Sequence, residues 1–168
     1  MKLYFFYGTM SAGKSLNLLA KAHQFKEAGS RNIMLKSAID TREEGVIKTR
    51  AGLQSECHLI QPDENIIEKV AKLLPADTVF VDEVQFLSKE QIHQLWRLAK
   101  FGNIRVFCYG LKTDFKNRLF PASAELFVLA DKSEELISKC AKCGSKATTH
   151  IKIGGSDKTL EIGDTKDN

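Results

Sequence analysis

The sequence begins with a strand-like run that leads directly into a glycine-bearing, phosphate-binding motif. Residues 8–15 read Gly-Thr-Met-Ser-Ala-Gly-Lys-Ser, a full match to G-x-x-x-x-G-K-[ST]. Residues 2–7 are aromatic and apolar, as in a buried strand, and a helical pattern starts at Leu16. A glycine-bearing turn between strand and helix points backbone N–H groups and the positive helix end at an anion. The motif therefore predicts a site for a nucleoside triphosphate.

Two side chains of this motif carry their own chemistry. Lys14 can reach the β and γ phosphates, and the Ser15 hydroxyl can bind Mg²⁺. A chance match in a glycine-containing turn is the alternative, and the flanking strand and helix disfavour it. We expect every residue of the motif to line the phosphates: Gly8, Thr9, Met10, Ser11, Ala12, Gly13, Lys14 and Ser15.

Composition limits the class of protein. A chain of 168 residues with 43% hydrophobic content can form one domain with a sizeable core and a small appendage. Plentiful Leu, Ile, Val and Phe exclude global disorder. The net charge of +4 suits a phosphate-binding protein, but it is spread along the chain and forms no nucleic-acid-binding stripe.

Cysteine use and the absence of an apolar leader or long apolar run predict a cytoplasmic protein that does not enter membranes. Cys57 and Cys108 stand alone in strand-like stretches and are expected to be buried apolar side chains. Four cysteines in a chain of this size do not make a disulfide scaffold.

Apolar patterns further along the chain alternate between strands and helices. This alternation predicts a three-layer α/β fold around a mainly parallel sheet. The polar stretch from Ile39 to Gln54 lacks apolar periodicity and is expected to be a long mobile loop. The expected strands are 32–36, 57–60, 78–81 and 105–109, and the expected helices are 65–74 and 88–100, the second opened by a capping box at Ser88.

Two acidic residues follow the apolar strand 78–81. The strand should deliver Asp82 to the sheet edge beside the Mg²⁺ held by Ser15. Glu83 would activate water in an ATPase, or accept a proton from a substrate hydroxyl in a kinase. A solvated acid pair is the alternative, and the intact phosphate-binding motif disfavours it. Phe86 could stack on a base, although taken alone it fits a core position equally well.

Four motifs in the same order resemble the cytosolic-type (type II) thymidine kinases over nearly the whole chain. They are residues 8–15, Asp40-Thr41-Arg42, residues 81–86 (Val-Asp-Glu-Val-Gln-Phe) and residues 109–115 (Tyr-Gly-Leu-Lys-Thr-Asp-Phe). The resemblance implies transfer of the γ-phosphoryl group of ATP to the 5′-hydroxyl of thymidine, a step of pyrimidine deoxynucleoside salvage for DNA synthesis. It also implies a homotetramer and feedback inhibition by thymidine triphosphate (dTTP).

The same resemblance assigns roles to individual residues. Glu83 matches the family's catalytic base, and Ser15, Asp82 and Asp40 match the magnesium-binding group. Arg42 matches a phosphate-side residue; without the resemblance, it and Asp40 would be interpreted as parts of a solvated loop. The positions that match the nucleoside pocket, which could otherwise form a hydrophobic cluster under a loop, are Met10, Phe86, Leu111, Phe115 and Phe120.

The last part of the chain is poorer in apolar residues and is expected to be a small annex, residues 139–168, attached to a kinase domain of residues 1–138. Cys140 and Cys143 have zinc-knuckle spacing, but a structural zinc needs four ligands. The family supplies a second pair downstream, and this sequence has no Cys or His after His150. We expect that the chain is trimmed before that pair; natural loss of zinc, or His150 as a third ligand, are the alternatives.

The segment from about Lys146 to the last residue resembles the family's nucleoside-covering loop. Two other functions compete with a thymidine kinase: an ATPase acting on nucleic acid through the cysteine annex, and a regulatory nucleotide-binding switch. A basic stripe with interleaved aromatic residues would favour the first, and the annex does not show one. Glu83 beside Asp82 argues against the second.

Overall fold

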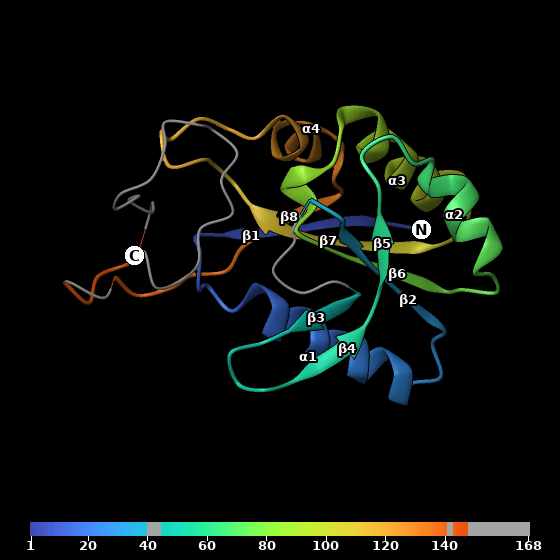
Figure 1. The fold of residues 1–168 in the computed structure, drawn as a ribbon, viewed down its shortest axis with the longest axis horizontal. Coiled ribbons are helices and arrows are strands. Elements are labelled where there is room, and N and C mark those ends of the chain that lie inside the picture. The colour runs from blue at the N-terminus through green and yellow to red at the C-terminus, as the bar shows by residue number, and fades with distance from the viewer. Residues whose placement is uncertain (40–44, 141–142, 148–168) are drawn as a thin grey trace.

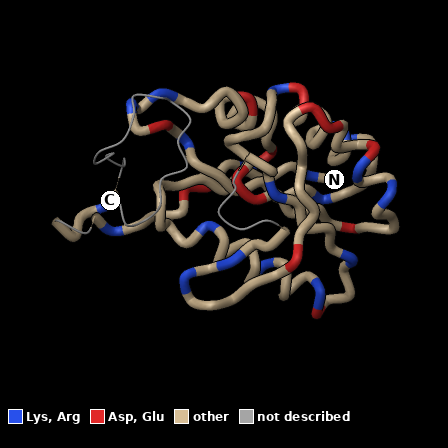
Figure 2. Tube along the Cα trace, viewed as in Figure 1, with Lys and Arg blue, Asp and Glu red and all other residues tan. Residues whose placement is uncertain are grey.

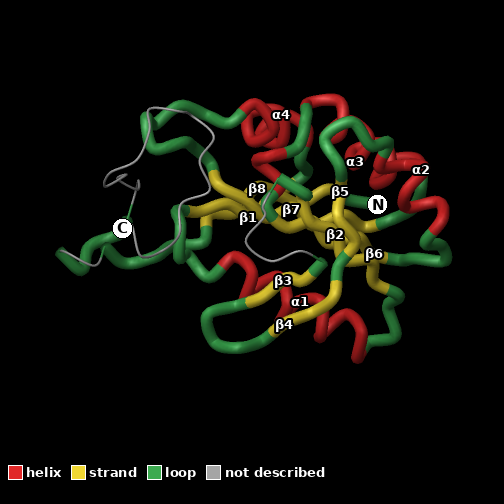
Figure 3. Tube along the Cα trace, in the orientation of Figure 1, coloured by secondary structure: helices red, strands yellow, loops and turns green. Residues whose placement is uncertain are grey.

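A six-stranded parallel sheet forms the centre of the computed structural model, which describes residues 1–39, 45–140 and 143–147 (Figures 1 and 3). The strand order is β5-β2-β6-β7-β1-β8, and every recorded pair in this sheet is parallel. The strands are β1 (Leu3–Gly8), β2 (Asn32–Ser37), β5 (His58–Ile60), β6 (Thr78–Asp82), β7 (Arg105–Leu111) and β8 (Lys132–Glu135). The predicted α/β class with a mainly parallel sheet is confirmed.

Helices cover both faces of the sheet. α1 lies on one face, while α2, α3 and α4 lie on the other, as Figure 1 shows. A short 3₁₀ turn, η1, connects the end of β6 to the loop before α3. The helical elements are α1 (Lys14–Glu27), α2 (Ile66–Lys72), η1 (Val84–Phe86), α3 (Lys89–Phe101) and α4 (Pro121–Leu129).

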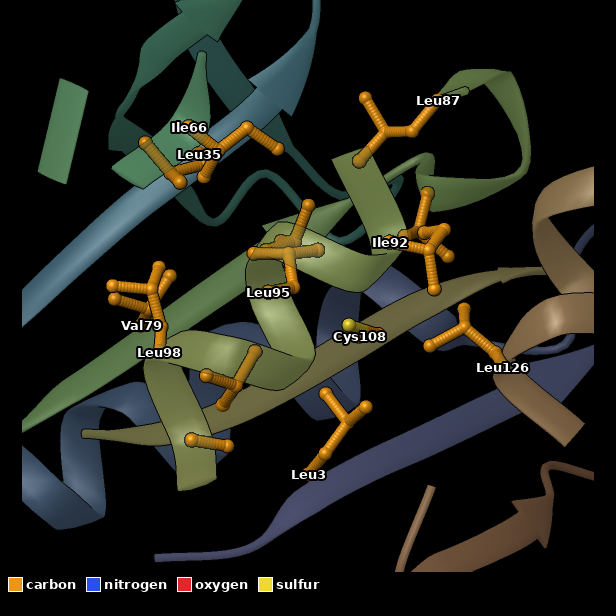
Figure 4. Close-up of a cluster of buried hydrophobic side chains, with 14 of the residues drawn as sticks. Leu3, Leu35, Ile66, Val79, Leu87, Ile92, Leu95, Leu98, Cys108 and Leu126 are labelled. Carbon is orange, nitrogen blue, oxygen red and sulfur yellow. The ribbon is translucent and has the colours of Figure 1, made fainter. Parts of the chain in front are cut away.

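The two faces of the sheet are packed with different side chains. The face under α2, α3 and α4 is mostly aliphatic and includes Leu3, Leu95 and Leu126, all fully buried (Figure 4). The face under α1 is aromatic: the rings of Phe80 and Phe107 stack 5.0 Å apart, and Phe107 also stacks on Tyr4 at 4.7 Å. Continuous apolar strands are expected where a parallel sheet is covered on both faces.

Several local signals act as the sequence predicts. The Ser88 hydroxyl accepts from the Gln91 N–H, and the Gln91 side chain accepts from the Ser88 N–H, which completes the capping box of α3. Gly29 follows the end of α1 with a φ of 86°, a left-handed conformation that glycine adopts without strain.

The polar stretch between β2 and β5 is not simply a loop. Residues Val46–Lys48 (β3) pair antiparallel with Gln54–Glu56 (β4), so the prediction of a long loop over 39–54 was wrong for this part. The hairpin is held at its turn by Thr49, whose hydroxyl accepts from the Leu53 N–H. Cys57 also departs from expectation: it precedes β5 and is only half-buried, whereas Cys108 is fully buried.

The charges of the described chain are spread over helices, hairpin and loops, with both signs interspersed (Figure 2). In the part of the chain that the structure describes, no helix combines the length and apolar character needed to cross a membrane. The proposed boundary between residues 138 and 139 stays a prediction.

Candidate active site

The phosphate-binding motif lies where β1 ends, and residues 8–15 are called the phosphate loop below. Ser11 and Gly13 have φ values of 64° and 72°, a turn conformation that aims successive backbone N–H groups into a concave anion site. α1 then starts at Lys14. The Lys14 side chain is buried and its Nζ donates to the carbonyl oxygen of Thr9 at 2.8 Å, so the ammonium group lies against the loop itself.

Parallel pairing brings the end of β6 to the same edge of the sheet. The hydroxyl of Ser15 donates to Oδ2 of Asp82 at 3.0 Å. A hydroxyl and a carboxylate oxygen are hard donors of the kind that Mg²⁺ prefers, and two adjacent ligands of an octahedral Mg²⁺ lie about 3.0 Å apart. The described donor set therefore fits the predicted magnesium-binding group.

Asp82 is an unusual carboxyl group because it is almost fully buried. Burial, followed by the neighbouring negative charge of Glu83, raises the pKa of Asp82 above its ordinary value. The Ser15 hydroxyl and the Lys14 charge act in the opposite direction. A buried carboxylate beside a second one is stabilised in its charged form by a cation, which agrees with a metal-binding role.

Glu83 follows Asp82 in a left-handed backbone conformation, with φ 52° and ψ 40°. For a residue other than glycine this conformation is uncommon, and such residues cluster at functional sites. The turn is held at both ends: the Glu83 N–H donates to Oδ1 of Asp82 at 3.0 Å, and Oε2 of Glu83 accepts from Nε2 of Gln85 at 2.6 Å.

A second group of predicted residues assembles beside η1. The rings of Phe86 and Phe120 meet edge to face, with centroids 6.2 Å apart. Leu111, at the end of β7, is held through both main-chain groups: its N–H donates to Oε1 of Gln85, and its carbonyl oxygen accepts from the Ser123 hydroxyl at 2.6 Å. The structure thus brings three of the five predicted nucleoside-pocket residues into one neighbourhood.

The other two predicted pocket residues lie in adjoining segments. Met10 is a half-buried residue of the phosphate loop, and Phe115 is half-buried in the turn between β7 and α4. That turn is organised by Asp114, a buried side chain whose Oδ1 accepts from the N–H groups of Lys116 and Arg118. Sequence reasoning assigned no role to Asp114, although an aspartate that begins a polar turn is typical of this Asx-type bonding.

Two further buried polar residues were missed by sequence reasoning. Gln85 was noted only as part of the acidic motif, and it links Glu83 to Leu111. Lys36 is buried at the end of β2, where its Cα lies opposite Asp82 in the strand pairing. The sequence did contain a signal for this position: a lysine is seldom buried without a charged partner, so an isolated lysine within an apolar strand indicates a carboxylate nearby.

The predicted zinc ligands lie in one tight turn. The N–H of Cys140 donates to the carbonyl oxygen of Ser145, and the N–H of Gly144 donates to that of Cys140, with Gly144 at a φ of 72°. In the described part of the chain neither Cys140 nor Cys143 forms a disulfide. Within the described ranges no group of three or more His, Cys, Asp or Glu side chains could hold a metal ion. Asp40, Arg42, His150 and residues 148–168 lie outside the described residues.

A family model and several curated relatives all point to the same protein family. The family model described as thymidine kinase matches residues 1–167. A thymidine kinase of Zymomonas mobilis is 39% identical over 166 residues, which cover 96% of this chain and 86% of the relative. A thymidine kinase of Ruegeria pomeroyi is 41% identical over 166 residues, covering 96% and 83%. One of Listeria monocytogenes is 39% identical over 165 residues, covering 97% and 86%.

A solved structure of Bacteroides Pif1 bound to ssDNA matches 80% of this chain and 38% of its own, at 15% identity and a TM-score of 0.45. A likeness this low carries no weight for fold or function.

Proposed function

This chain belongs to the thymidine kinase family and is a nucleoside kinase, and from that premise we propose that it transfers the γ-phosphoryl group of ATP to the 5′-hydroxyl of thymidine. The observation that carries the proposal is the meeting of two groups at one sheet edge. Asp82 bonds to Ser15 of the phosphate loop, and within four residues the same turn supplies Glu83 and the Phe86 ring that meets Phe120.

In the proposed reaction, the phosphate loop and Lys14 bind the β and γ phosphates. Ser15, Asp82 and Asp40, the last assigned by the family resemblance, would hold Mg²⁺, which would neutralise charge on the phosphate oxygens. The Glu83 carboxylate accepts the proton of the 5′-hydroxyl as that oxygen forms its bond to the γ phosphorus. The bond from the γ phosphorus to the bridging oxygen breaks, and ADP leaves with the electron pair. Arg42 would add positive charge on the phosphate side.

The acceptor is proposed to lie against the aromatic group beside η1. Phe86 and Phe120 offer ring edges and faces of the size that packs against a pyrimidine base, and Leu111 adds an apolar side chain. Met10 and Phe115 are proposed to complete this wall. A pocket built mainly from apolar side chains with few polar groups is typical for small-molecule recognition.

The decisive experiment measures ADP release from ATP and Mg²⁺ with and without thymidine, and with single-stranded DNA in place of thymidine. Thymidine-dependent release of ADP, with thymidine monophosphate as the second product, is the expected result. ADP release that is independent of thymidine and increases with DNA would instead support an ATPase acting on nucleic acid.

The role of Glu83 has its own test. Glu83→Gln keeps the size of the side chain but removes the proton acceptor, so ATP affinity should stay within about twofold while kcat falls by on the order of 10²–10⁴-fold. Nucleotide binding by fluorescence titration and kcat by product analysis measure the two quantities. Turnover retained in this variant would refute Glu83 as the base.

Three further properties come with the family resemblance and are proposals for this chain: a homotetramer, inhibition by dTTP and a structural zinc. The cytoplasmic location expected from the sequence is also a proposal. Cys140 and Cys143 have knuckle spacing in the sequence, and the backbone hydrogen bonds of Cys140 to Gly144 and Ser145 support the zinc proposal because they form a turn at this position. Metal analysis of the protein and light scattering test zinc and oligomeric state. A metal-free monomer that is insensitive to dTTP would contradict these three properties without affecting the kinase assignment.

A further inference from the structure

Gln85 is a buried side chain whose amide group makes two hydrogen bonds at the site. It is 3% exposed and belongs to η1, the turn directly after Glu83. Its Nε2 donates to Oε2 of Glu83 at 2.6 Å, and its Oε1 accepts from the N–H of Leu111 at 3.0 Å. One amide thus joins the proposed catalytic base to Leu111, which lies at the end of β7 and 26 residues after Gln85.

The orientation of this amide is fixed by its partners. A backbone N–H can only donate, so the atom facing Leu111 must be the amide oxygen. An ionised carboxylate can only accept, so the atom facing Glu83 must be the NH₂ group. A flip of the amide would break both bonds and place donor against donor. The bridge therefore has one amide orientation, with the NH₂ group on Glu83 and the oxygen on Leu111.

The backbone around Gln85 is shaped to admit this bridge. A Cβ at Gly110 would lie 2.6 Å from Oε1 of Gln85 and 2.8 Å from Cγ1 of Val84, closer than real side-chain contacts. β7 can therefore approach η1 only because residue 110 has no side chain. Close approach of two segments is a position where glycine is needed.

We propose that Gln85 is a positioning residue for the phosphoryl transfer. By binding both Glu83 and Leu111, it holds the Glu83 carboxylate at a fixed position relative to the nucleoside pocket, so that the base stays aligned with the 5′-hydroxyl. This proposal rests on the proposed function, in which Glu83 is the base and Leu111 lies at the nucleoside. Proton transfer depends on the distance and angle between base and hydroxyl. A carboxylate freed to rotate loses that alignment without losing affinity for ATP.

The main test compares Gln85→Met with a matched control, Gln94→Met. Gln94 is also buried, and its Oε1 accepts from a backbone N–H, that of Ile66, at 2.8 Å, but it lies in α3 away from the site. Gln85→Met should lower kcat by about 10- to 100-fold with little change in the KM for ATP. Gln94→Met should lose similar thermal stability and keep its kcat. An equal loss of kcat in both variants would overturn the proposal.

A double-mutant cycle separates positioning from general damage. In the Glu83→Ala background the carboxylate is gone, so Gln85→Met should lower the residual single-turnover rate by less than about threefold. If Gln85 only stabilised the fold, its effect would be the same in both backgrounds, and the two losses would multiply. A multiplicative result therefore contradicts the proposal.

Gln85→Glu decides the question if Gln85→Met does not fold. It keeps the side-chain size and an oxygen for the Leu111 N–H but removes the donor to Glu83, and Gln94→Glu is its control. We expect a kcat loss of at least about tenfold in the first and none in the second. Wild-type kcat in Gln85→Glu overturns the inference. The proposed function fails separately, if the wild type lacks thymidine-dependent turnover or if Glu83→Ala retains it.

Discussion

The proposed donor side of the site, for ATP, and the proposed acceptor side, for thymidine, are built in different ways. The donor side is one contiguous loop, residues 8–15, shaped by main-chain conformation at Ser11 and Gly13. The acceptor side gathers η1, the end of β7 and the turn before α4, and side chains such as Gln85 and Ser123 hold these segments through main-chain atoms. A change on the donor side should therefore disturb ATP, whereas a change on the acceptor side should disturb thymidine.

Among the changes that distinguish the two sides, the largest effect is expected from removing the positive charge of the donor side. Lys14→Ala should lower kcat by on the order of 10²–10³-fold, because the ammonium group is expected to stabilise charge on the transferring phosphoryl group. Steady-state kinetics with varied ATP and varied thymidine measure it. Lys21→Ala is the control and should keep its kcat: Lys21 lies about two helical turns along α1, with its ammonium group over the Phe6 ring. A kcat within threefold of wild type in Lys14→Ala would contradict the donor assignment.

A smaller effect is expected from crowding the donor loop. In Gly8→Ala the new Cβ would lie 2.5 Å from the carbonyl oxygen of Leu136 and 2.9 Å from the Cβ of Ala12, so the loop must shift. We expect the KM for ATP to rise about tenfold, with about 1–3 kcal/mol lost from the free energy of unfolding.

The control for this variant is Gly52→Ala, at the tip of the β3–β4 hairpin. Gly52 has open space around it but a φ of 84°, so alanine there should cost about 1 kcal/mol of stability and leave both KM values unchanged. Thermal unfolding and kinetics measure the pair. If Gly8→Ala raised the KM for thymidine more than that for ATP, the division into two sides would be wrong.

On the acceptor side, Asp114→Ala should act on thymidine. The substitution removes the acceptor for two N–H groups in the turn that carries Phe115, so we expect the KM for thymidine to rise about fivefold while the KM for ATP stays within twofold. Asp77→Ala is the control: this exposed carboxylate also accepts from a backbone N–H, that of Arg31, but far from the site. If Asp114→Ala raised the KM for ATP as much as the KM for thymidine, the division into a donor side and an acceptor side would be wrong.

The smallest effect is expected from Ser123→Ala. The lost hydrogen bond to the carbonyl oxygen of Leu111 should cost about 1 kcal/mol of stability. Because Gln85 still holds the N–H of the same residue, the KM for thymidine should change less than threefold. Ser30→Ala, which removes a hydroxyl bonded to Asn32 at the other end of the sheet, should leave both KM values unchanged. A rise in the KM for thymidine beyond tenfold would contradict this expectation and show that the Ser123 hydrogen bond is needed to position Leu111.

The same contrast explains what sequence reasoning could predict. The donor side is contiguous, so its motif, strand and helix can be recognised from local residues, and the Ser15–Asp82 pair followed from the edge where parallel strands end. The acceptor wall depends on bonds between residues far apart in sequence, such as Gln85 with Leu111, which no local pattern encodes. Family resemblance named Phe86 and Phe120, but only the structure brings their rings together.

Missed elements have weak local patterns for physical reasons. α4 (Pro121–Leu129) is apolar on several sides, so it lacks the one-sided periodicity of a surface helix. β8 (Lys132–Glu135) is a polar edge strand whose residues are largely exposed, which conceals it from any search for alternating apolar residues. The β3–β4 hairpin is made of two three-residue strands in a polar stretch.

The position of β1 in the sheet has a consequence for synthesis on the ribosome. β1 is the first strand of the described chain, yet within that chain it pairs only with the last two strands, β7 and β8. A parallel strand without neighbours has unpaired backbone groups on both sides. The phosphate loop is therefore synthesised well before residues 105–135, which supply the strands that pair with β1, have emerged. We therefore expect the proposed ATP site to be completed only late in synthesis, once β7 and β8 can pair with β1.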